Sequence, residues 1–309
     1  MKYIVTGGAG FIGSHIVEKL AQLNHEVVIF DNLYSGKMEN ISPFLGMDNV
    51  TMVHGTITDL QLLQQTFEGA AGIFHEAAIA SVPQSIMNPL ETNEVNIIGT
   101  LNVLVAARDC RVRKIVFASS SSVYGNTPIL PKHEDMLPNP LSPYAVSKLT
   151  GEYYLRVFAE VYGLQTVALR YFNVFGPRQD LKSQYAAVIP NFIKTILKNE
   201  SPVIYGDGKQ TRDFTYVKDV VQANIRAMES NAQGVFNVAY AKSISLKELA
   251  AIIMESTGII VSLFYESPRI GDITDSLADI TRAQGALGYV PEYTVKTGLE
   301  ETIEWYRNQ

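Results

Sequence analysis

Several features that would each point to a particular class of protein are scarce in this sequence. Among its 309 residues there is one cysteine, Cys110, which excludes a disulfide framework and a cysteine-based zinc site. Lys and Arg number 25 against 31 Asp and Glu, so the net charge of −6 argues against a nucleic-acid-binding protein. The sequence lacks both the run of about eighteen apolar residues that a membrane span needs and a secretory signal. We therefore expect a cytoplasmic protein.

Apolar residues, by contrast, make up 47% of the chain, and only 18% of the residues are charged. A chain of this composition is not expected to be disordered. A chain of about 300 residues buries roughly three quarters of its unfolded surface and commonly forms about two domains. The composition therefore indicates a globular protein with a large core.

The first half of the sequence alternates short apolar runs with helical periodicities, of which Ile12, Ile16 and Leu20 mark the first. The runs are apolar throughout, as is typical of strands buried on both faces of a parallel sheet. This alternation predicts an α/β fold, namely a Rossmann-type doubly wound parallel sheet with helices on both faces. The predicted strands are Tyr3–Thr6, Glu26–Phe30, Val50–Val53, Gly72–His75, Lys114–Ala118 and Thr166–Leu169.

The regular alternation of strand and helix patterns ends after about Phe175, and the second half of the sequence is richer in turn residues. It still predicts a strand at Val235–Val238 and helices at Val188–Leu197, Val217–Met228 and Leu246–Thr257. We expect an NAD-binding domain over residues 1–174, with return segments near 213–239. A smaller C-terminal α/β substrate-binding lobe is expected over residues 175–212 and 240–309, with a cleft between the two.

Three glycines, Gly7, Gly10 and Gly13, stand between the first predicted strand and the first predicted helix. Glycine permits a tight turn, and the N-terminus of the following helix favours an anion such as a pyrophosphate. Asp31 ends the second strand about twenty residues on, where an acid binds the ribose hydroxyls of NAD and disfavours the extra phosphate of NADP. Together these residues predict an NAD site; the alternative is a structural strand–turn–helix with an incidental acid.

Tyr144 and Lys148 are four residues apart at the start of a predicted helix and so share a face. A neighbouring ammonium group favours the phenolate, which is a better base. Ser120 lies in a serine run at the carboxyl end of a predicted strand, where its hydroxyl could relay a proton; the alternative is a strand end that caps the next segment. Tyr205 and Lys209 have the same spacing but enclose a turn sequence, so they are not expected on a helix.

Together, residues 7–13, Asp31, Ser120, Tyr144 and Lys148 resemble the extended short-chain dehydrogenase/reductase family. Residues 118–125, 169–178, 205–214 and 268–272 favour its nucleotide-sugar epimerase and dehydratase branch. The resemblance runs from residue 3 to about residue 299. It implies NAD as the cofactor and a nucleotide sugar as the small-molecule substrate.

By this resemblance, Tyr144 is the catalytic base and Ser120 is the catalytic Ser/Thr. Lys148 favours the ionised form of Tyr144 and contacts the nicotinamide ribose. Arg212 and Arg269 hold the diphosphate, for which guanidinium forks are suited; on their own they would be assigned to surface pairs. In addition to the three glycines, Asp31, Tyr144 and Lys148, the implied cofactor residues are Phe11, Ile12, Asn32, Ser35, Gly36, Thr56, Ile57, Ala77, Ala78, Asn96, Ser119 and Phe172. The implied substrate residues are Ser81, Ser120, Ser121, Tyr144, Asn173, Val188, Tyr205, Arg212, Arg269, Asp272 and Ser276.

Thr56 departs from the family pattern, which has an aspartate there, so it cannot supply a carboxylate contact to the adenine. Ser121 and Ser122 stand where dehydratases have an acid pair, which favours 4-epimerisation of UDP-hexoses through a 4-keto intermediate. Ser276 matches the position that gates the sugar 2-substituent and leaves room for an N-acetyl group, so we expect UDP-GlcNAc and UDP-GalNAc to be accepted. Acceptance of UDP-Glc and UDP-Gal stays open, and the alternative for Ser276 is an ordinary loop serine.

Two other activities are consistent with these residues. One is a different nucleotide-sugar oxidoreductase, decarboxylase or dehydratase on the same scaffold, and the other is a dinucleotide-sensing protein without catalysis. The resemblance also implies a homodimer that pairs through residues 93–108 and 144–162. We expect no metal, because the adjacent His75 and Glu76 point to opposite sides of a strand, and we expect His15 to be solvated.

Overall fold

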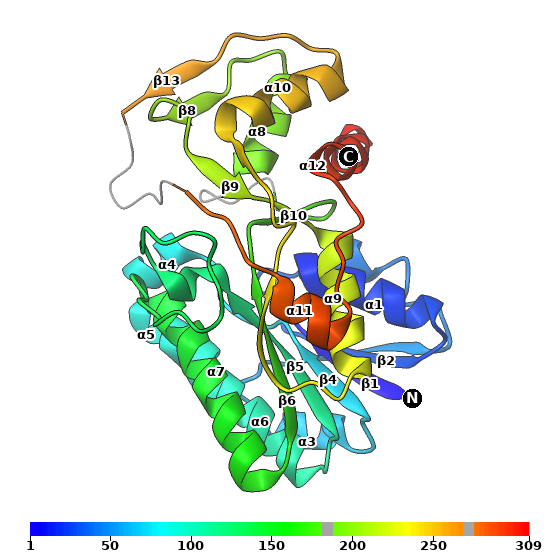
Figure 1. The fold of residues 1–309 in the computed structure, drawn as a ribbon. Coiled ribbons are helices and arrows are strands. Elements are labelled where there is room, and N and C mark those ends of the chain that lie inside the picture. Colours follow the sequence, from blue (N-terminus) through cyan, green and yellow to red (C-terminus); the bar gives the residue numbers. More distant parts are fainter. Residues whose placement is uncertain (181–187, 268–274, 309) are drawn as a thin grey trace.

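A computed structural model describes residues 1–180, 188–267 and 275–308. It contains a seven-stranded parallel sheet in the order β11-β6-β5-β4-β1-β2-β3, so the predicted doubly wound fold is confirmed (Figure 1). The order reverses at β1, whose neighbours are β2 and β4, and this is where ligands bind in such sheets. The strands are β1 (Lys2–Thr6), β2 (Glu26–Asp31), β3 (Val50–His54), β4 (Gly72–His75), β5 (Lys114–Ser120), β6 (Gln165–Tyr171) and β11 (Gly234–Val238).

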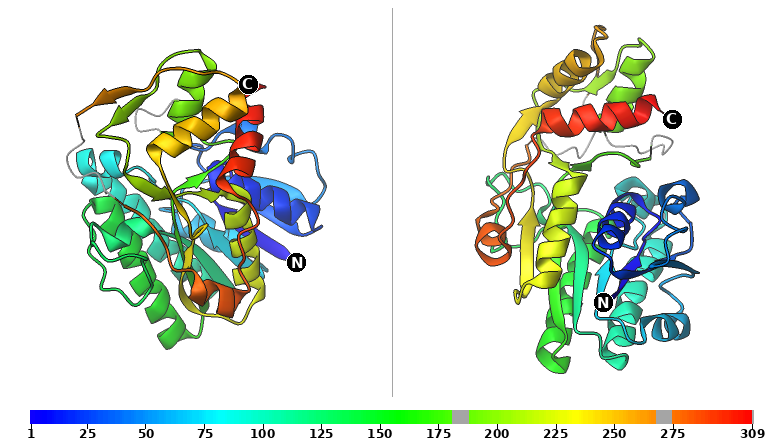
Figure 2. Two further views of the ribbon diagram at one scale, coloured as in Figure 1. Left: turned by 45° about the horizontal axis from the view of Figure 1, so that its top comes forward. Right: turned by 90° about the vertical axis from the view of Figure 1, so that its right-hand side faces the viewer.

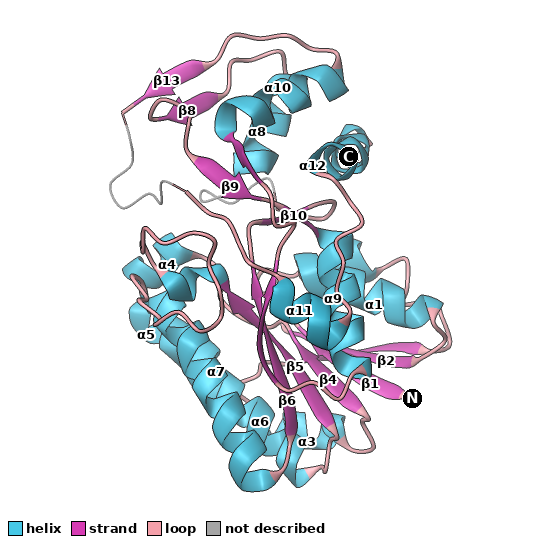
Figure 3. Cartoon of the chain, viewed as in Figure 1, coloured by secondary structure: helices cyan, strands magenta, loops and turns pink. Residues whose placement is uncertain are grey.

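Helices cover both faces of the sheet because successive side chains of each strand point to opposite faces (Figure 3). Val5 and Val27 pack in one core with α1 (Phe11–Gln22) and α9 (Val217–Glu229). Ile4 and Val28 pack in another core on the opposite face. The helices of that face are α3 (Leu60–Phe67), α6 (Gly99–Asp109) and α7 (Pro143–Tyr162).

A third core lies in a second lobe, which stands beyond the carboxyl ends of the sheet strands (Figure 2). Helices α8 (Val188–Leu197) and α10 (Leu246–Thr257) have the bounds predicted from their apolar periodicity, and α12 (Val295–Arg307) packs with them. The strands of this lobe have only three residues each, too few for a periodicity to be read from sequence. They are β8 (Val203–Tyr205), which pairs with β13 (Phe264–Glu266), and β9 (Thr211–Asp213), which pairs with β12 (Ser243–Ser245).

The two lobes are joined where β7 (Val174–Phe175) pairs with β10 (Thr215–Tyr216). The chain returns to the sheet a second time through α11 (Thr281–Leu287), and Tyr289 donates a hydrogen bond to the Ala239 carbonyl at 2.9 Å. Among the described residues, no helix has both the length and the apolar character that crossing a bilayer requires. The remaining short elements are α2 (Met38–Ile41), α4 (Val82–Met87), α5 (Pro89–Asn93), a π-helix (Glu94–Ile98) and a 3₁₀ helix (Ser121–Tyr124).

Candidate active site

The glycine loop between β1 and α1 forms a cradle that larger residues would fill. Gly7 has φ 69°, and a Cβ atom there would lie 2.7 Å from the Ala77 nitrogen. A Cβ atom on Gly13 would lie 2.2 Å from the Gly7 carbonyl oxygen. Gly10 caps α1 without a side chain, and the first turn of α1 contains no acid, so its N–H groups and dipole favour an anion. The cradle therefore fits the pyrophosphate of a dinucleotide.

Asp31 is buried beside this loop at the end of β2. One carboxylate oxygen accepts a hydrogen bond from the Ala9 N–H at 3.0 Å, and the other accepts one from the Leu33 N–H at 2.7 Å. A Cβ atom on Gly36 would lie 2.8 Å from the same carboxylate. Each oxygen keeps a second lone pair. Asp31 thus joins the glycine loop to the loop of Asn32, Ser35 and Gly36, and it can still accept from ribose hydroxyls.

Asn96 holds the opposite side of the cradle. Its side-chain oxygen accepts from the Ile79 N–H at 2.8 Å, and its nitrogen donates to the Ile79 carbonyl and to the Ser147 hydroxyl, both at 3.1 Å. Asn96 thereby fastens the segment that carries Ala77 and Ala78 to α7. The predicted cofactor residue Thr56 instead engages in a local turn, in which its hydroxyl lies 2.9 Å from that of Thr58.

Tyr144, Lys148 and Ser120 meet at the carboxyl end of β5. Ser142 caps α7 by accepting from the Ala145 N–H at 3.1 Å, which places Tyr144 in the first turn. The Lys148 ammonium donates to the Ala118 carbonyl at 2.8 Å and lies 5.8 Å from the centre of the Tyr144 ring. The Ser120 hydroxyl faces the Tyr144 phenol and interacts with it electrostatically. Ser120 also accepts a hydrogen bond from the Ser122 N–H at 3.1 Å. It therefore caps the 3₁₀ helix that follows, as one of the two predictions had it, and also faces Tyr144.

Burial dominates the electrostatics of this cluster. It raises the pKa of Tyr144, and the interaction with Ser120 opposes that rise. This differs from the expectation of a favoured phenolate, because removal of the phenol from water outweighs its polar neighbours. Burial also lowers the pKa of Lys148 to about 8, although the Glu76 carboxylate opposes that fall. His75 is a neutral core residue between the Thr6 and Thr100 hydroxyls, and burial lowers its pKa to about 3.

A buried ion pair that the sequence analysis missed locks α7 onto the sheet. Arg170 of β6 donates twice to the Glu152 carboxylate of α7, at 2.8 and 2.7 Å. Ser119 of β5 donates to the same carboxylate at 2.5 Å, and the Arg170 guanidinium lies 4.7 Å from the centre of the Tyr124 ring. The pair fixes the helix that carries Tyr144 relative to the strand that carries Ser120. Glu152 is one of several charged residues of α7, so only Arg170, which directly follows an apolar predicted strand, was unusual in the sequence.

Replacing Glu152 with Ala is expected to lower the free energy of unfolding by about 3–5 kcal/mol, because Arg170 would be left buried without its carboxylate. Urea unfolding followed by circular dichroism measures the change. Glu160→Ala is the matched control, since Glu160 lies on the same helix but pairs with Arg156 in solvent and is 70% exposed. Surface pairs of this kind contribute little. Equal midpoints for the two variants would contradict the locking role.

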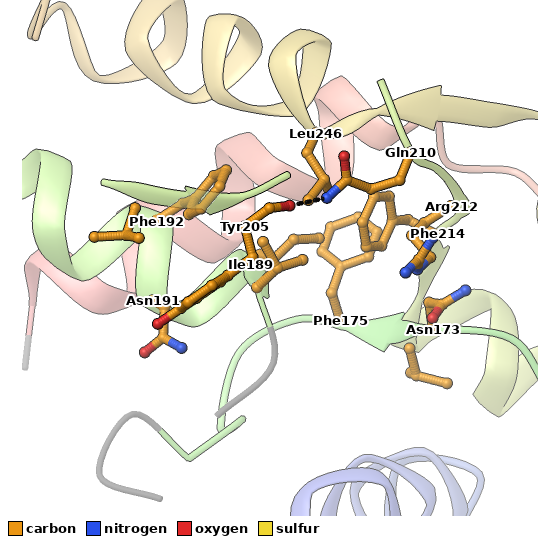
Figure 4. Close-up of a pocket in the computed structure, with 13 residues that line it drawn as sticks. Asn173, Phe175, Ile189, Asn191, Phe192, Tyr205, Gln210, Arg212, Phe214 and Leu246 are labelled. Atoms are coloured by element: carbon orange, nitrogen blue, oxygen red, sulfur yellow. Dashed lines mark hydrogen bonds between the residues drawn. The ribbon is translucent and has the colours of Figure 1, made fainter. Parts of the chain in front are cut away.

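A pocket in the second lobe brings together four predicted substrate residues: Asn173, Val188, Tyr205 and Arg212 (Figure 4). The Asn173 amide donates to the Asp213 carbonyl at 2.9 Å. Tyr205 is the last residue of strand β8. This confirms the prediction that it does not lie on a helix. The sequence analysis missed the rest of the lining because apolar residues carry no chemical signature; it includes Phe175, Ile189, Phe192, Phe214, Leu246 and the polar Gln210.

The other predicted substrate residues do not line this pocket among the described residues. Ser276 is half-buried, and its N–H donates to the Thr211 carbonyl at 3.1 Å, next to Arg212. Ser81 caps α4 by accepting from the Gln84 N–H at 3.2 Å. Ser121 begins the 3₁₀ helix that follows Ser120. Arg269 and Asp272 lie outside the described residues.

The expectation that His15 is solvated is wrong. Only 8% of this residue is exposed, its Nε2 atom lies 3.0 Å from the Pro177 carbonyl, and burial lowers its pKa to about 3. The segment around Pro177 folds against α1, where Arg178 donates to Glu18 at 2.6 Å. This contact joins residues that are 160 positions apart, so no local sequence pattern predicts it.

Known proteins resemble the chain over most or all of its length. A family model described as the NAD dependent epimerase/dehydratase family matches residues 3–239. The solved UDP-N-acetylglucosamine 4-epimerase of Methanobrevibacter ruminantium M1, in complex with UDP-N-acetylmuramic acid, is 46% identical with a TM-score of 0.96, covering 100% of this chain and 98% of that one. A UDP-glucose 4-epimerase of Mycolicibacterium smegmatis is 39% identical over an alignment of 313 positions that covers 100% of this chain and 99% of the relative. A UDP-N-acetyl-alpha-D-glucosaminuronate decarboxylase of Bacillus cytotoxicus is 36% identical over an alignment of 316 positions that covers 98% of this chain and 97% of the relative.

Proposed function

The chain belongs to the NAD dependent epimerase/dehydratase family, and on that premise we propose that it is a UDP-sugar 4-epimerase that interconverts UDP-hexoses with NAD. The observation that carries the proposal is the contact of Tyr144 with Ser120 and Lys148 between a dinucleotide cradle and a pocket suited to a nucleotide. Similarity over the whole chain to proteins named as UDP-sugar 4-epimerases supports it.

NAD bound at the glycine loop supplies the acceptor and donor of the hydride at sugar C4. Tyr144, as phenolate, takes the proton of the 4-hydroxyl group, with Ser120 as the bridge. The Lys148 ammonium, held by the Ala118 carbonyl, stabilises the phenolate when it forms. Once the 4-keto sugar has turned, the hydride would return to the opposite face of C4 and Tyr144 returns the proton to the C4 oxygen, so the proton balance closes over one cycle.

This turning requires tight binding at the nucleotide end and loose binding at the sugar. The apolar and aromatic pocket around Phe175 and Phe214 provides the former, and Arg212 at its rim is suited to the diphosphate. Arg269 belongs to this proposal as the second guanidinium. The small side chain of Ser276, which lies next to Arg212, leaves space for an N-acetyl group in the substrates UDP-GlcNAc and UDP-GalNAc.

Three other functions fit the site less well than 4-epimerisation does. Dehydration is disfavoured because Ser121 and Ser122 offer no carboxylate at the end of β5. Decarboxylation needs a uronic acid as substrate. A protein that only senses dinucleotide has no need of a tyrosine that faces Ser120 beside a buried lysine.

The deciding experiment incubates the protein with UDP-GlcNAc, UDP-GalNAc, UDP-Glc, UDP-Gal and a UDP-uronic acid and separates the products by chromatography. We expect each accepted sugar to give its C4 epimer without net formation of NADH. Accumulation of NADH, or turnover only of a UDP-uronic acid, would favour another oxidoreductase or a decarboxylase. Absence of turnover with all of these sugars, despite bound NAD, would favour the sensor.

The proposal includes the division into domains. The NAD-binding domain spans residues 1–174 with return segments near 213–239, and the substrate-binding lobe spans 175–212 and 240–309. Within the latter range, α11 packs in the core of the sheet rather than in the lobe. The pocket lies in the second lobe and the glycine loop in the first, which supports a substrate bound between them. A cytoplasmic location stays a prediction from the sequence.

We also propose a homodimer that pairs through α7 and the helices of residues 93–108. Apolar side chains at helical spacing are exposed along α7, among them Val146 (45%), Val157 (42%) and Val161 (65%). A monomer rarely exposes such a continuous apolar face.

Size-exclusion chromatography with light scattering is expected to give twice the mass of the chain. Val157→Glu combined with Val161→Glu should give the mass of one chain, because two buried carboxylates would oppose pairing. Ile260→Glu is the control, since Ile260 is 88% exposed in the other lobe. A monomeric wild-type protein, or equal masses for the control and the double variant, would contradict this interface.

A further inference from the structure

One carboxylate at the end of β4 has no part in the mechanism described so far. Glu76 directly precedes Ala77 in the segment that faces the glycine loop, and its Oε1 atom accepts a hydrogen bond from the Tyr171 hydroxyl at 2.9 Å. The Tyr171 oxygen in turn accepts one from the Asn224 amide at 2.8 Å, and that amide also donates to the Val220 carbonyl at 2.9 Å. A chain of hydrogen bonds through β6 and α9 therefore orients this carboxylate.

The groups that surround Glu76 explain why its charge matters. From α7, Lys148 and Tyr144 both interact with it electrostatically. From β6, Tyr171 is its titratable neighbour, whereas Asn224 of α9 is neutral. The adjacent His75 is neutral and bonds the Thr6 and Thr100 hydroxyls.

Three groups therefore interact in one site, in which Lys148 is buried and Glu76 and Tyr144 are half-buried. Burial raises the pKa of Glu76 to about 7, although Tyr171 and Lys148 oppose the rise. The Glu76 carboxylate in turn raises the pKa of Lys148 against the burial that lowers it, and it raises the pKa of Tyr144. Without this carboxylate, burial would drive Lys148 toward the neutral amine, which cannot stabilise a phenolate.

We propose that Glu76 is a positioning residue of the active site: oriented by Tyr171, its carboxylate keeps Lys148 an ammonium group beside Tyr144 and so sets the pH range in which this pair works. The inference rests on the proposed epimerase function. It assigns to the hydrogen-bond chain of Asn224, Tyr171 and Glu76 the task of placing one negative charge opposite the lysine.

The first test compares the pH dependence of kcat in the wild-type protein with that of Glu76→Gln. Both the acidic and the alkaline limbs should move to lower pH by about one unit, because the loss of a negative charge lowers the pKa of Tyr144 and of Lys148 alike. The KM for the UDP-sugar should change much less than kcat at alkaline pH. Glu76→Asp should restore part of the wild-type profile. Glu26→Gln, an exposed carboxylate at the start of β2, should leave the profile in place.

Tyr171→Phe provides a second variant in case Glu76→Gln folds poorly. It keeps the carboxylate but removes the donor that holds the pKa of Glu76 down, so its profile should shift in the same direction by a smaller amount. The proposal would be overturned if the pH profiles of kcat for both variants coincided with the wild-type profile, whatever the absolute rates.

A titration without turnover separates this inference from the proposed function. The ultraviolet difference between the protein and its Tyr144→Phe variant isolates the ionisation of Tyr144. We expect that ionisation at lower pH in the Glu76→Gln background than in the wild type. A shift in a protein that epimerises no UDP-sugar would sustain the role of Glu76 and refute the epimerase. An unshifted ionisation in an active epimerase would refute only the role of Glu76.

Discussion

Replacing Tyr144 with Phe is expected to lower kcat for UDP-hexose epimerisation by about a thousandfold. The change removes the phenol oxygen that interacts with Ser120, which is the group proposed to move the proton of the 4-hydroxyl. The centre of its ring lies 5.8 Å from the Lys148 ammonium. The ring stays, so packing in the first turn of α7 is kept. Because the oxygen acts in the transition state rather than in nucleotide binding, KM should change little.

Product separation under saturating substrate measures this effect, and NAD retained by the purified protein checks that the cofactor site is intact. Tyr153→Phe is the matched control, since Tyr153 lies on the same helix, is 49% exposed and faces away from the site. Its rate should equal that of the wild type. A Tyr144→Phe variant that keeps more than a tenth of the wild-type kcat would require a different base.

The second large effect concerns the choice of sugar. Replacing Ser276 with Tyr should reduce turnover of UDP-GlcNAc and UDP-GalNAc by at least about tenfold while turnover of an accepted plain UDP-hexose is kept. The Ser276 N–H donates to the Thr211 carbonyl, so the substitution leaves that backbone contact intact and adds only a ring at this half-buried position. The ring would occupy the space that the N-acetyl group is expected to need, and such crowding is destabilising to binding.

Competition between acetylated and plain sugars in one reaction measures this selectivity directly. Ser276→Ala is the control, since it changes the polarity of the position but not the space, and it should keep the wild-type ratio. Equal loss of both activities, or of neither, would show that Ser276 is an ordinary loop serine.

Local patterns account for a large part of the fold and for the chemical identity of the site. The glycine spacing at residues 7–13 needs only a strand before it and a helix after it, and both are present. The spacing of Tyr144 and Lys148 places them on one face of any helix. The periodicities behind α8 and α10 gave their bounds because one buried face repeats every turn.

Contacts between distant segments could not be derived in this way. Glu152 and Arg170 look like ordinary charged residues until α7 is laid over β6. His15 is buried only because residues near Pro177 fold back onto α1. The apolar lining of the pocket, from Phe175 to Leu246, becomes a site only when the second lobe closes around it.

By itself, then, the sequence determined the class of fold, the cofactor loop and the pairing of a tyrosine with a lysine, because each depends on residues within a few turns of one another. The tertiary structure alone decided which charges are buried and what faces them. Glu76 and Tyr171 stand 95 positions apart in the chain, and their hydrogen bond exists because parallel strands end at the same edge of the sheet. The pKa values of Tyr144 and Lys148 depend on their burial and on charged groups from distant parts of the sequence. Neither can be derived from the residues that lie near them in the sequence.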